Sequence, residues 1–218
     1  MSNEDSVSDV DVQAAGVTLP GILGCPPGSI GIVIFAHGSG SSRLSSRNQA
    51  VARWLRERGC ATLLFDLLTD AEAANRANVF DIDLLGKRVV EATSWLKRRD
   101  DARDLPIGYF GASTGAAAAL AAAAELGGDI AAVVSRGGRP DMAIPFMDRV
   151  QSPTLLIVGS RDTMVLDLNR QAQQHMRCEN ELSIIDGATH LFEEPGTLEQ
   201  AADRAGDWFV RHFGKAES

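Results

Sequence analysis

Short apolar runs alternate with amphipathic segments along most of the chain. The apolar runs fit strands that are covered on both faces, because such strands are apolar almost throughout. The segments between and after them have helical periodicity. This alternation predicts an α/β fold, with a mostly parallel central sheet and helices on both of its faces. The expected strands are residues 29–36, 61–67, 107–110, 130–134, 154–158 and 181–185, and the expected helices are residues 48–58, 82–98, 114–126, 166–177 and 198–212.

The N-terminal region departs from this alternation. Residues 1–12 are acidic and polar, which predicts a disordered tail, so the folded domain is expected to occupy residues 13–218. Residues 12–23 favour one or two antiparallel strands at an edge of the sheet, although Pro20 and two glycines weaken that pattern. The chain has 218 residues, 44% of them hydrophobic, which is enough for one core, and we expect a single domain.

Charge and cysteine content exclude several classes of protein. A formal net charge of −8 offers no basic surface for a polyanion, so nucleic acid is not an expected partner. The longest apolar run, residues 116–124, has about half the length that crosses a bilayer, so no membrane association is expected. The first residues lack the features of a secretory signal, and Cys25, Cys60 and Cys178 form no metal or redox motif. We therefore expect a cytoplasmic protein with unreactive thiols, while its oligomeric state stays open.

A serine lies where an expected strand meets an expected helix, in the pentapeptide Gly111-Ala112-Ser113-Thr114-Gly115. This fits the G-x-S-x-G nucleophile elbow, a sharp turn that projects the serine hydroxyl outward. Glycine on either side avoids collisions with the turn, and the N–H groups of the following helix point toward the place where an anion forms. The alternative is a tight connection in which the serine only caps the helix.

A serine hydroxyl becomes a nucleophile only with a base nearby, and the base needs an acid that fixes its tautomer. In parallel sheets, functional side chains gather where the strands end. Asp162 follows one expected strand and His190 follows the next, so both are predicted to meet Ser113 at that edge. The order Ser, Asp, His along the chain is that of the α/β-hydrolases.

Other residues compete for these two roles. Asp186 and Asp167 are rival acids, but Asp186 ends the same strand that precedes His190 and Asp167 already lies in an expected helix, so neither has the expected placement. His37 ends the first long strand, in a loop with a different predicted role, while His175 and His212 fall in expected helices and are expected at the surface. We therefore favour Asp162 and His190, and the triad predicts a catalytic serine.

The loop HGSGSSR, residues 37–43, follows the first long strand and exposes backbone N–H groups through its small residues. We expect the N–H of Ser39 to join that of Thr114 in an oxyanion hole, which would stabilise the negative charge of a tetrahedral intermediate. A flexible serine–glycine loop without a role in catalysis is the alternative.

Four segments in this order, FAHGSGSS, GYFGASTGAAAAL, LLIVGSRD and GATHLFEEPG, resemble the α/β-hydrolase superfamily and, within it, the dienelactone hydrolase-like group. The resemblance implies Ser113 as nucleophile, Asp162 as acid and His190 as base, with oxyanion amides from Ser39 and Thr114. It also implies a single-domain fold, and the short connection at residues 138–152 indicates that no cap domain is inserted. Such chemistry requires neither a metal nor an organic cofactor.

The sequence departs from the named dienelactone hydrolases at the nucleophile, where that group has cysteine and this chain has Ser113. This favours a serine esterase that cleaves carboxylic esters, lactones or other small acyl compounds through an acyl-enzyme. The partner is then a small-molecule ester. Arg136 and Arg139 follow residues 130–134 at the same edge of the sheet, and Arg136, ahead of Arg139 or Arg43, is expected to bind an anionic group of the substrate. Ion pairs with Asp141, Asp66 or other acidic residues are the structural alternative.

Two other functions remain open at this point. The first is a noncatalytic binding protein that keeps the fold, which the complete triad disfavours. The second is a dinucleotide-binding oxidoreductase, because Gly38-Ser39-Gly40 follows a strand and Asp66 ends the next. Arg43 stands where that motif requires its third glycine, so the second function is weaker.

Overall fold

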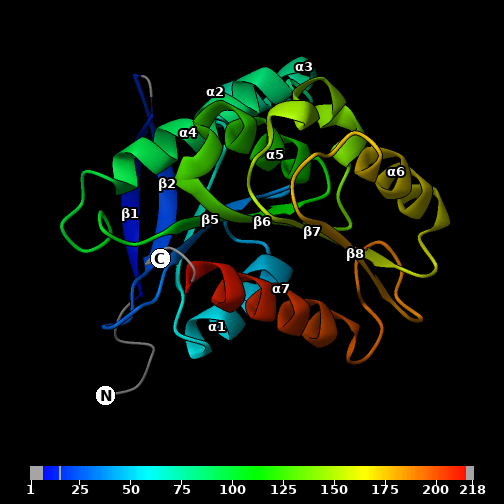
Figure 1. Cartoon of the computed structure of the whole chain (residues 1–218). Coiled ribbons are helices and arrows are strands. Elements are labelled where there is room, and N and C mark those ends of the chain that lie inside the picture. Colours follow the sequence, from blue (N-terminus) through cyan, green and yellow to red (C-terminus); the bar gives the residue numbers. More distant parts are fainter. Residues whose placement is uncertain (1–6, 15, 215–218) are drawn as a thin grey trace.

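An eight-stranded sheet runs through the molecule in the order β1-β2-β4-β3-β5-β6-β7-β8 (Figure 1). We describe residues 7–14 and 16–214 from a computed structural model. β1 and β2 run antiparallel at one edge, while β3 to β8 run parallel to one another. The strands are β1 (Val7–Ala14), β2 (Val17–Gly24), β3 (Ile32–Ala36), β4 (Ala61–Phe65), β5 (Ile107–Ala112), β6 (Ile130–Arg136), β7 (Thr154–Gly159) and β8 (Asn180–Ile185).

Helices cover both faces of this sheet, as the alternating pattern predicts. Two of them, α1 and α7, lie below the sheet in the view of Figure 1, and the others lie above it. The longer helices are α1 (Ser46–Glu57), α4 (Ile82–Leu96), α5 (Gly115–Leu126), α6 (Thr163–Gln173) and α7 (Thr197–Phe213). The shorter ones are α2 (Asp70–Ala73) and α3 (Arg76–Val79), with 3-10 turns η2 (Gly127–Asp129) and η3 (Pro140–Arg149).

The expectation of a disordered tail through residue 12 is wrong for residues 7–12, which belong to β1 and pair with β2. Val12 and Ala14 are buried, and the polar residues Asp11 and Gln13 alternate with them on the solvent side. This period of two fits a strand with one covered face. The high acid content of the segment favoured a disordered tail instead. The expected antiparallel strands at the edge of the sheet are confirmed, and residues 1–6 lie outside the described residues.

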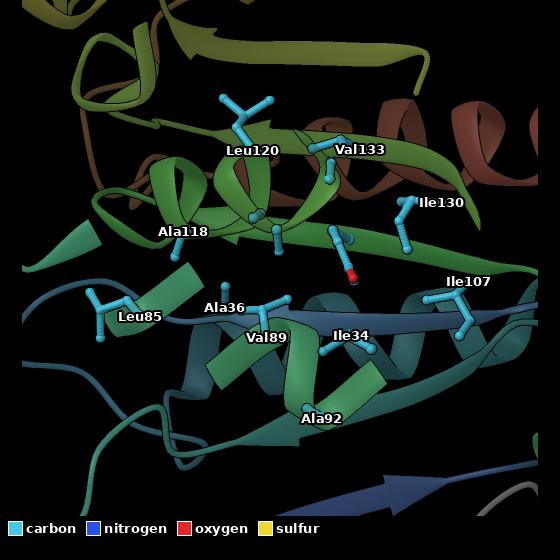
Figure 2. Close-up of a cluster of buried hydrophobic side chains, with 14 of the residues drawn as sticks. Ile34, Ala36, Leu85, Val89, Ala92, Ile107, Ala118, Leu120, Ile130 and Val133 are labelled. Atoms are coloured by element: carbon cyan, nitrogen blue, oxygen red, sulfur yellow. The ribbon is translucent and has the colours of Figure 1, made fainter. Parts of the chain in front are cut away.

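The alanine-rich helix α5 is buried over most of its length, between the sheet, α4 and η3. Figure 2 shows Ala118 and Leu120 of α5 among apolar side chains of α4 and the strands. A Cβ added to Gly86 of α4 would lie 3.0 Å from the Cβ of Ala121, so small residues let the two helices approach closely. The helix is thereby fixed directly behind the turn that carries Ser113.

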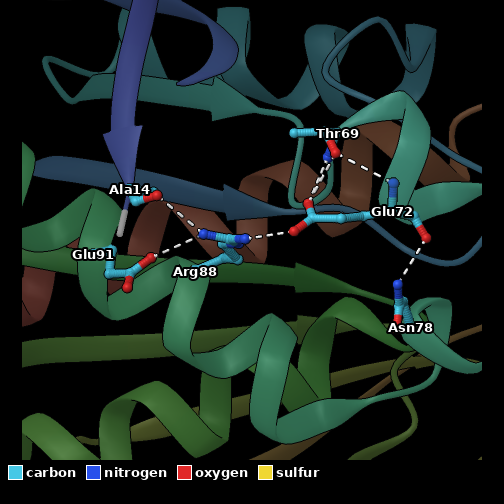
Figure 3. A network of polar contacts seen from close by, with 6 residues as sticks. All are labelled: Ala14, Thr69, Glu72, Asn78, Arg88 and Glu91. Carbon is cyan, nitrogen blue, oxygen red and sulfur yellow. Dashed lines mark hydrogen bonds and ion pairs between the residues drawn. The ribbon is translucent and has the colours of Figure 1, made fainter. Parts of the chain in front are cut away.

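The short helices α2 and α3 were not expected, because their polar sequence has no apolar periodicity. Capping fixes both helices, and the buried side chain of Arg88 on α4 also holds α2 (Figure 3). Thr69 and Glu72 form a capping box at the start of α2, and Glu72 also pairs with Arg88 at 2.7 Å. Arg88 further contacts Glu91 at 3.3 Å and the carbonyl of Ala14 at 3.0 Å, so one guanidinium joins α2, α4 and β1.

The connection from β6 to β7 forms no cap domain in the described chain. It contains η3, which packs against α5 and α6, and so leaves the ends of the strands uncovered by a separate unit. Within residues 7–14 and 16–214, no helix has the length and apolar character that spanning a bilayer requires.

Candidate active site

Ser113 occupies a strained turn between β5 and α5. Its φ is 53°, a left-handed conformation that costs a non-glycine residue roughly 1–3 kcal/mol. A Cβ on Gly111 would come within 2.4 Å of Ala116 Cα, and a Cβ on Gly115 within 2.1 Å of the Ala36 carbonyl oxygen. Both glycines of the pentapeptide are therefore required by backbone approach, as the sequence pattern predicts.

Asp162 and His190 are brought together from the ends of β7 and β8. Asp162 Oδ2 lies 2.6 Å from His190 Nδ1, a short hydrogen bond. Because a carboxylate only accepts, this contact places a proton on Nδ1 and leaves Nε2 as the acceptor of the neutral ring. The Asp162 side chain is 13% exposed and that of His190 39%, so the acid is enclosed while the imidazole reaches the surface of the site.

The rival residues have other contacts. Asp186 accepts from the Ser160 hydroxyl at 3.2 Å, and Asp167 pairs with Arg170 at 3.2 Å on the exposed side of α6. His175 is exposed just beyond α6. The expectation for His212 is wrong, since it is buried against the ring of Trp208. The helix α7 has a wide apolar face, and packing against Trp208 places the His212 imidazole within that face.

Ser113 and His190 line one cavity of about 370 Å³ at the carboxyl edge of the sheet. Ser113 is half-buried there. Backbone hydrogen bonds join its N–H to the carbonyl of Arg136 at 3.3 Å and its carbonyl to the N–H of Arg139 at 3.0 Å, so the end of β6 holds the turn. The cavity is lined by Gly38, Ser39, Gly40, Ser41, Ser45, Arg47, Asn48, Ala112, Ser113, Arg136, Gly137, His190 and Leu191.

The two predicted oxyanion amides differ in whether their N–H groups already donate a hydrogen bond. Among the described residues, no group accepts a hydrogen bond from the N–H of Thr114. The N–H of Ser39 is already engaged, because it donates to the Thr114 hydroxyl at 2.8 Å. Thr114 thus ties the 37–43 loop to the start of α5, and its side chain must turn away before Ser39 can serve a ligand.

The same loop is held on its other side by His37. Its Nδ1 lies 3.0 Å from the Gly38 carbonyl, and its Nε2 lies 3.0 Å from the N–H of Leu67. A neutral ring satisfies both contacts by donating from Nδ1 and accepting at Nε2. Burial lowers the pKa of His37, which favours this neutral form. His37 therefore has a structural role in the loop.

Three arginines considered at the sequence level have different partners. Arg139 forms a bidentate pair with Asp141 at 2.8 Å, and Arg43 pairs with Asp66 through both its side chain and its N–H. Arg139 and Arg43 therefore form the ion pairs that were the structural alternative to substrate binding. The pair with Arg43 also occupies the Asp66 carboxylate, which a dinucleotide-binding site would need for a ribose. Arg136 differs, since it is buried, lines the cavity and forms no ion pair with a described residue.

Arg47 and Asn48 also line the cavity and were not among the candidate residues. Both lie in the first turn of α1, which begins at Ser46 rather than at the expected residue 48. Ser45 caps this helix by accepting from the N–H of Asn48. The serine three residues before Asn48 is a helix-start signal that was available in the sequence.

The thiols are free and lie outside this cavity. Burial raises the pKa of Cys60 to about 11 and also raises the pKa of Cys25 and of Cys178, which lowers their thiolate content at neutral pH. Within the part of the chain that the structure describes, no cluster of three or more His, Cys, Asp or Glu side chains is arranged to hold a metal ion.

The chain is similar to proteins of one family. Residues 19–216 match the dienelactone hydrolase family. The solved structure of a dienelactone hydrolase from Anabaena variabilis is 49% identical, with a TM-score of 0.91 over 95% of this chain and 99% of that one. Est1E from Butyrivibrio proteoclasticus shares the fold, with a TM-score of 0.81 at 17% identity over 95% of this chain and 99% of its own.

Two curated relatives from strains of Mycobacterium tuberculosis carry a different name. Each is called "Putative phosphoribosyl transferase" and is 57% identical over 205 residues, which are 94% of this chain. The match covers only 46% of each relative, so this chain spans less than half of their length.

Proposed function

Because the chain belongs to the dienelactone hydrolase family, we propose that it is a serine hydrolase that cleaves carboxylic esters, lactones or other small acyl compounds. Ser113 is the nucleophile, His190 the general base and Asp162 the acid that orients it. The observation that carries this proposal is the 2.6 Å contact between Asp162 and His190, on an imidazole that shares a cavity with a strained serine.

Acylation begins when Ser113 Oγ attacks the ester carbonyl carbon and His190 Nε2 takes the hydroxyl proton. The carbonyl oxygen becomes an oxyanion beside the N–H of Thr114. A second donor, the N–H of Ser39, becomes available when the Thr114 hydroxyl releases it. The bond to the leaving oxygen then breaks, and that oxygen receives the proton from His190.

Deacylation repeats these steps with water. His190 takes a proton from a water molecule as its oxygen attacks the acyl-enzyme, and the proton then returns to Ser113 as the acid product leaves. Asp162 accepts the Nδ1–H hydrogen bond throughout and stabilises the imidazolium each time it forms. The open connection between β6 and β7 is compatible with small substrates that enter from solvent.

The name of the longer mycobacterial relatives does not change this proposal. Less than half of each relative matches this chain, and residues 19–216 of this chain match the dienelactone hydrolase family. The activity of a longer protein would include whatever the remaining part contributes.

Hydrolysis of 4-nitrophenyl butyrate by purified protein tests the proposed function. Ser113→Ala is expected to lower kcat by roughly four to six powers of ten, and Asp162→Asn by somewhat less. Asp186→Asn is the matched control and should keep wild-type activity, since Asp186 contacts Ser160 rather than His190. If wild type fails with a panel of 4-nitrophenyl esters and lactones, the noncatalytic alternative gains support. Unchanged turnover in Ser113→Ala would instead contradict the assignment of Ser113 as the nucleophile.

A further inference from the structure

Only two non-glycine residues of the described chain have a positive φ, and they lie in the segments that carry the proposed nucleophile and base. They are Ser113, at 53°, and Phe192, at 55°, two residues after His190. We propose that Phe192 is a positioning residue, which fixes the turn that carries His190 and so sets where the imidazole lies relative to Ser113. This inference rests on the proposed function, because Phe192 acts only through the base.

The backbone of Phe192 has a conformation that is unfavourable for a bulky side chain. A left-handed φ brings Cβ too close to the backbone, so glycine is the usual residue there. Gly187 and Gly196, in the same connection between β8 and α7, have φ values of 73° and 78°. A glycine at position 192 would form the same turn without strain, so the turn alone does not account for an aromatic residue there. Strained residues of this kind persist where surrounding contacts fix them, and they concentrate at functional sites.

The ring of Phe192 is anchored in the core between the sheet and the helices α1 and α7. The residue is only 3% exposed and belongs to the same buried cluster as Ala112, which directly precedes Ser113, and Ala205 of α7. At the end of β6, a Cβ added to Gly137 would lie 3.5 Å from Phe192 Cε2, an ordinary packing distance. The ring therefore ties the connection between β8 and α7 to the strands that end beside Ser113.

His190 lies on a short turn that is fixed at both ends. The N–H of Phe192 donates to the carbonyl of Thr189 at 3.2 Å, which closes the turn around His190. At the other end, the N–H of Thr189 donates to Glu194 Oε2 at 3.0 Å. Phe192 is the buried residue of this turn, whereas Leu191, between the base and Phe192, is exposed. The turn is therefore held to the core through the ring of Phe192.

The end of β6 confines this turn on one side. Gly137 has a φ of 52°, and a Cβ added there would lie 3.1 Å from the carbonyl oxygen of His190 and 3.6 Å from its Nδ1. The N–H of Gly137 donates to the carbonyl of Ile157 at 2.7 Å, which holds this glycine in place. The turn has little room to move closer to β6, and the anchored ring of Phe192 keeps it from moving away. Together these contacts hold the imidazole within reach of Asp162.

A fixed imidazole matters because proton transfer depends strongly on position. The base has to come within about 2.6–3.2 Å of the hydroxyl oxygen, and a displacement of about 1 Å can lower the rate roughly 100-fold. The contact with Asp162 restrains Nδ1, so the position of the reacting Nε2 still depends on the backbone of His190, which Phe192 fixes. Loss of the ring should therefore slow the chemical steps but leave substrate binding nearly unchanged, because Phe192 does not line the cavity.

Phe192→Leu tests this inference, because leucine keeps an apolar side chain at this position but removes the ring. With 4-nitrophenyl butyrate we expect kcat to fall roughly 10- to 100-fold, while KM changes less than about threefold. Phe209→Leu is the matched control, since Phe209 is fully buried in the same cluster but belongs to α7 and does not line the cavity. At a temperature well below the Tm of either variant, this control should keep kcat within about threefold of wild type. Equal losses of kcat in the two variants, or a wild-type kcat in Phe192→Leu, would overturn the inference while leaving the serine hydrolase intact.

Further variants separate the ring from the turn. Phe192→Gly removes the strain together with the ring, and its kcat should be at least as low as that of Phe192→Leu, whereas a wild-type kcat would contradict the inference. If neither variant folds, Glu194→Ala must lower kcat by about threefold or more, because it releases the other end of the turn. Glu193→Ala is the control for that variant, since Glu193 has a long contact with Arg47 instead. Equal kcat values in Glu194→Ala and Glu193→Ala would then count against the inference.

A spectroscopic readout separates this inference from the proposed function, because it requires no ester to be hydrolysed. Nitrogen-15 NMR of the histidine rings at about pH 8 shows which ring nitrogen carries the proton, and the signals lost in His190→Ala identify that residue. We expect one tautomer, protonated on Nδ1, in wild type and in Phe209→Leu, and a mixture of tautomers in Phe192→Leu. This result without any hydrolysis would support positioning by Phe192 while the proposed function fails. Identical spectra for wild type and Phe192→Leu would overturn the inference whatever the activity.

Discussion

Two buried arginines on opposite sides of the sheet have contrasting surroundings. Arg88, on α4, contacts two carboxylates and a backbone carbonyl, and these contacts join α2, α4 and β1 (Figure 3). Arg136, at the end of β6, has one contact with Asn48, two aromatic neighbours and two nitrogen atoms without partners among the described residues. Both side chains are almost wholly enclosed.

The difference indicates how charge is used in each region. At Arg88 the charge is neutralised by the chain itself, so the guanidinium stabilises the fold. At Arg136 no carboxylate of the described residues neutralises the charge, so this guanidinium is expected to add little to the stability of the fold. A buried cation therefore indicates a binding site only where no carboxylate of the chain pairs with it.

The largest effect on stability is expected from replacing the paired arginine. Arg88→Met should lower the free energy of unfolding by about 3–5 kcal/mol, because it leaves the Glu72 and Glu91 carboxylates without their cation. Arg136→Met, the matched variant, should leave stability within about 1 kcal/mol of wild type or raise it. Urea unfolding measures both. Equal destabilisation by the two substitutions would abolish the contrast between the regions.

A smaller effect concerns how the loop beside Ser113 is held. Thr114→Val keeps the side-chain volume but removes the acceptor for the Ser39 N–H. We expect a loss of about 1 kcal/mol in unfolding free energy, the usual net value of one hydrogen bond. Urea unfolding of Thr114→Val beside Thr114→Ser, which retains a hydroxyl, checks this. If the valine variant matches wild type while the serine variant is weaker, the hydrogen bond is not what holds the loop.

The smallest expected effect is on the pH dependence of stability. Burial lowers the pKa of His37 in the folded protein, so the unfolded chain takes up this proton first as the pH falls below about 6.5. The contribution of neutral His37 to the free energy of unfolding is fully present above that pH. It is lost as the pH falls from there to the pKa of His37 in the folded protein, with a slope of at most about 1.4 kcal/mol per pH unit.

His37→Gln removes this titration, while a glutamine side chain can still accept and donate one hydrogen bond each. Unfolding free energies between pH 4 and pH 8 should therefore depend less steeply on pH in the variant than in wild type. Parallel curves for the two proteins would show that His37 does not titrate in this way.

The sequence predicts the central sheet and the pairing of Asp162 with His190, because these follow from local patterns. Apolar runs mark strands, and polar residues after strands meet at one edge of the sheet. The short helices α2 and α3 were not predicted, because helix caps and, for α2, the ion pair with Arg88 fix them rather than an apolar periodicity of their own.

The surroundings of the site were harder to predict than its central residues. The sequence offers Arg136, ahead of Arg43 and Arg139, as a binding residue. Only the fold shows that Arg43 and Arg139 pair with carboxylates while Arg136 pairs with none among the described residues. Arg47 was not predicted to line the cavity, because it follows a serine-rich loop at a helix start. The bond between the Ser39 N–H and the Thr114 hydroxyl joins segments 75 residues apart, and no local pattern encodes such a contact.

Labelling with a fluorophosphonate tests the central claim most directly, because only an activated serine hydroxyl forms a stable adduct with this reagent. We predict one adduct per chain, located by peptide mass spectrometry at Ser113, absent from Ser113→Ala and much slower to form in His190→Ala. An unlabelled wild-type protein, or an adduct that persists in Ser113→Ala, would contradict the assignment of Ser113 as the nucleophile.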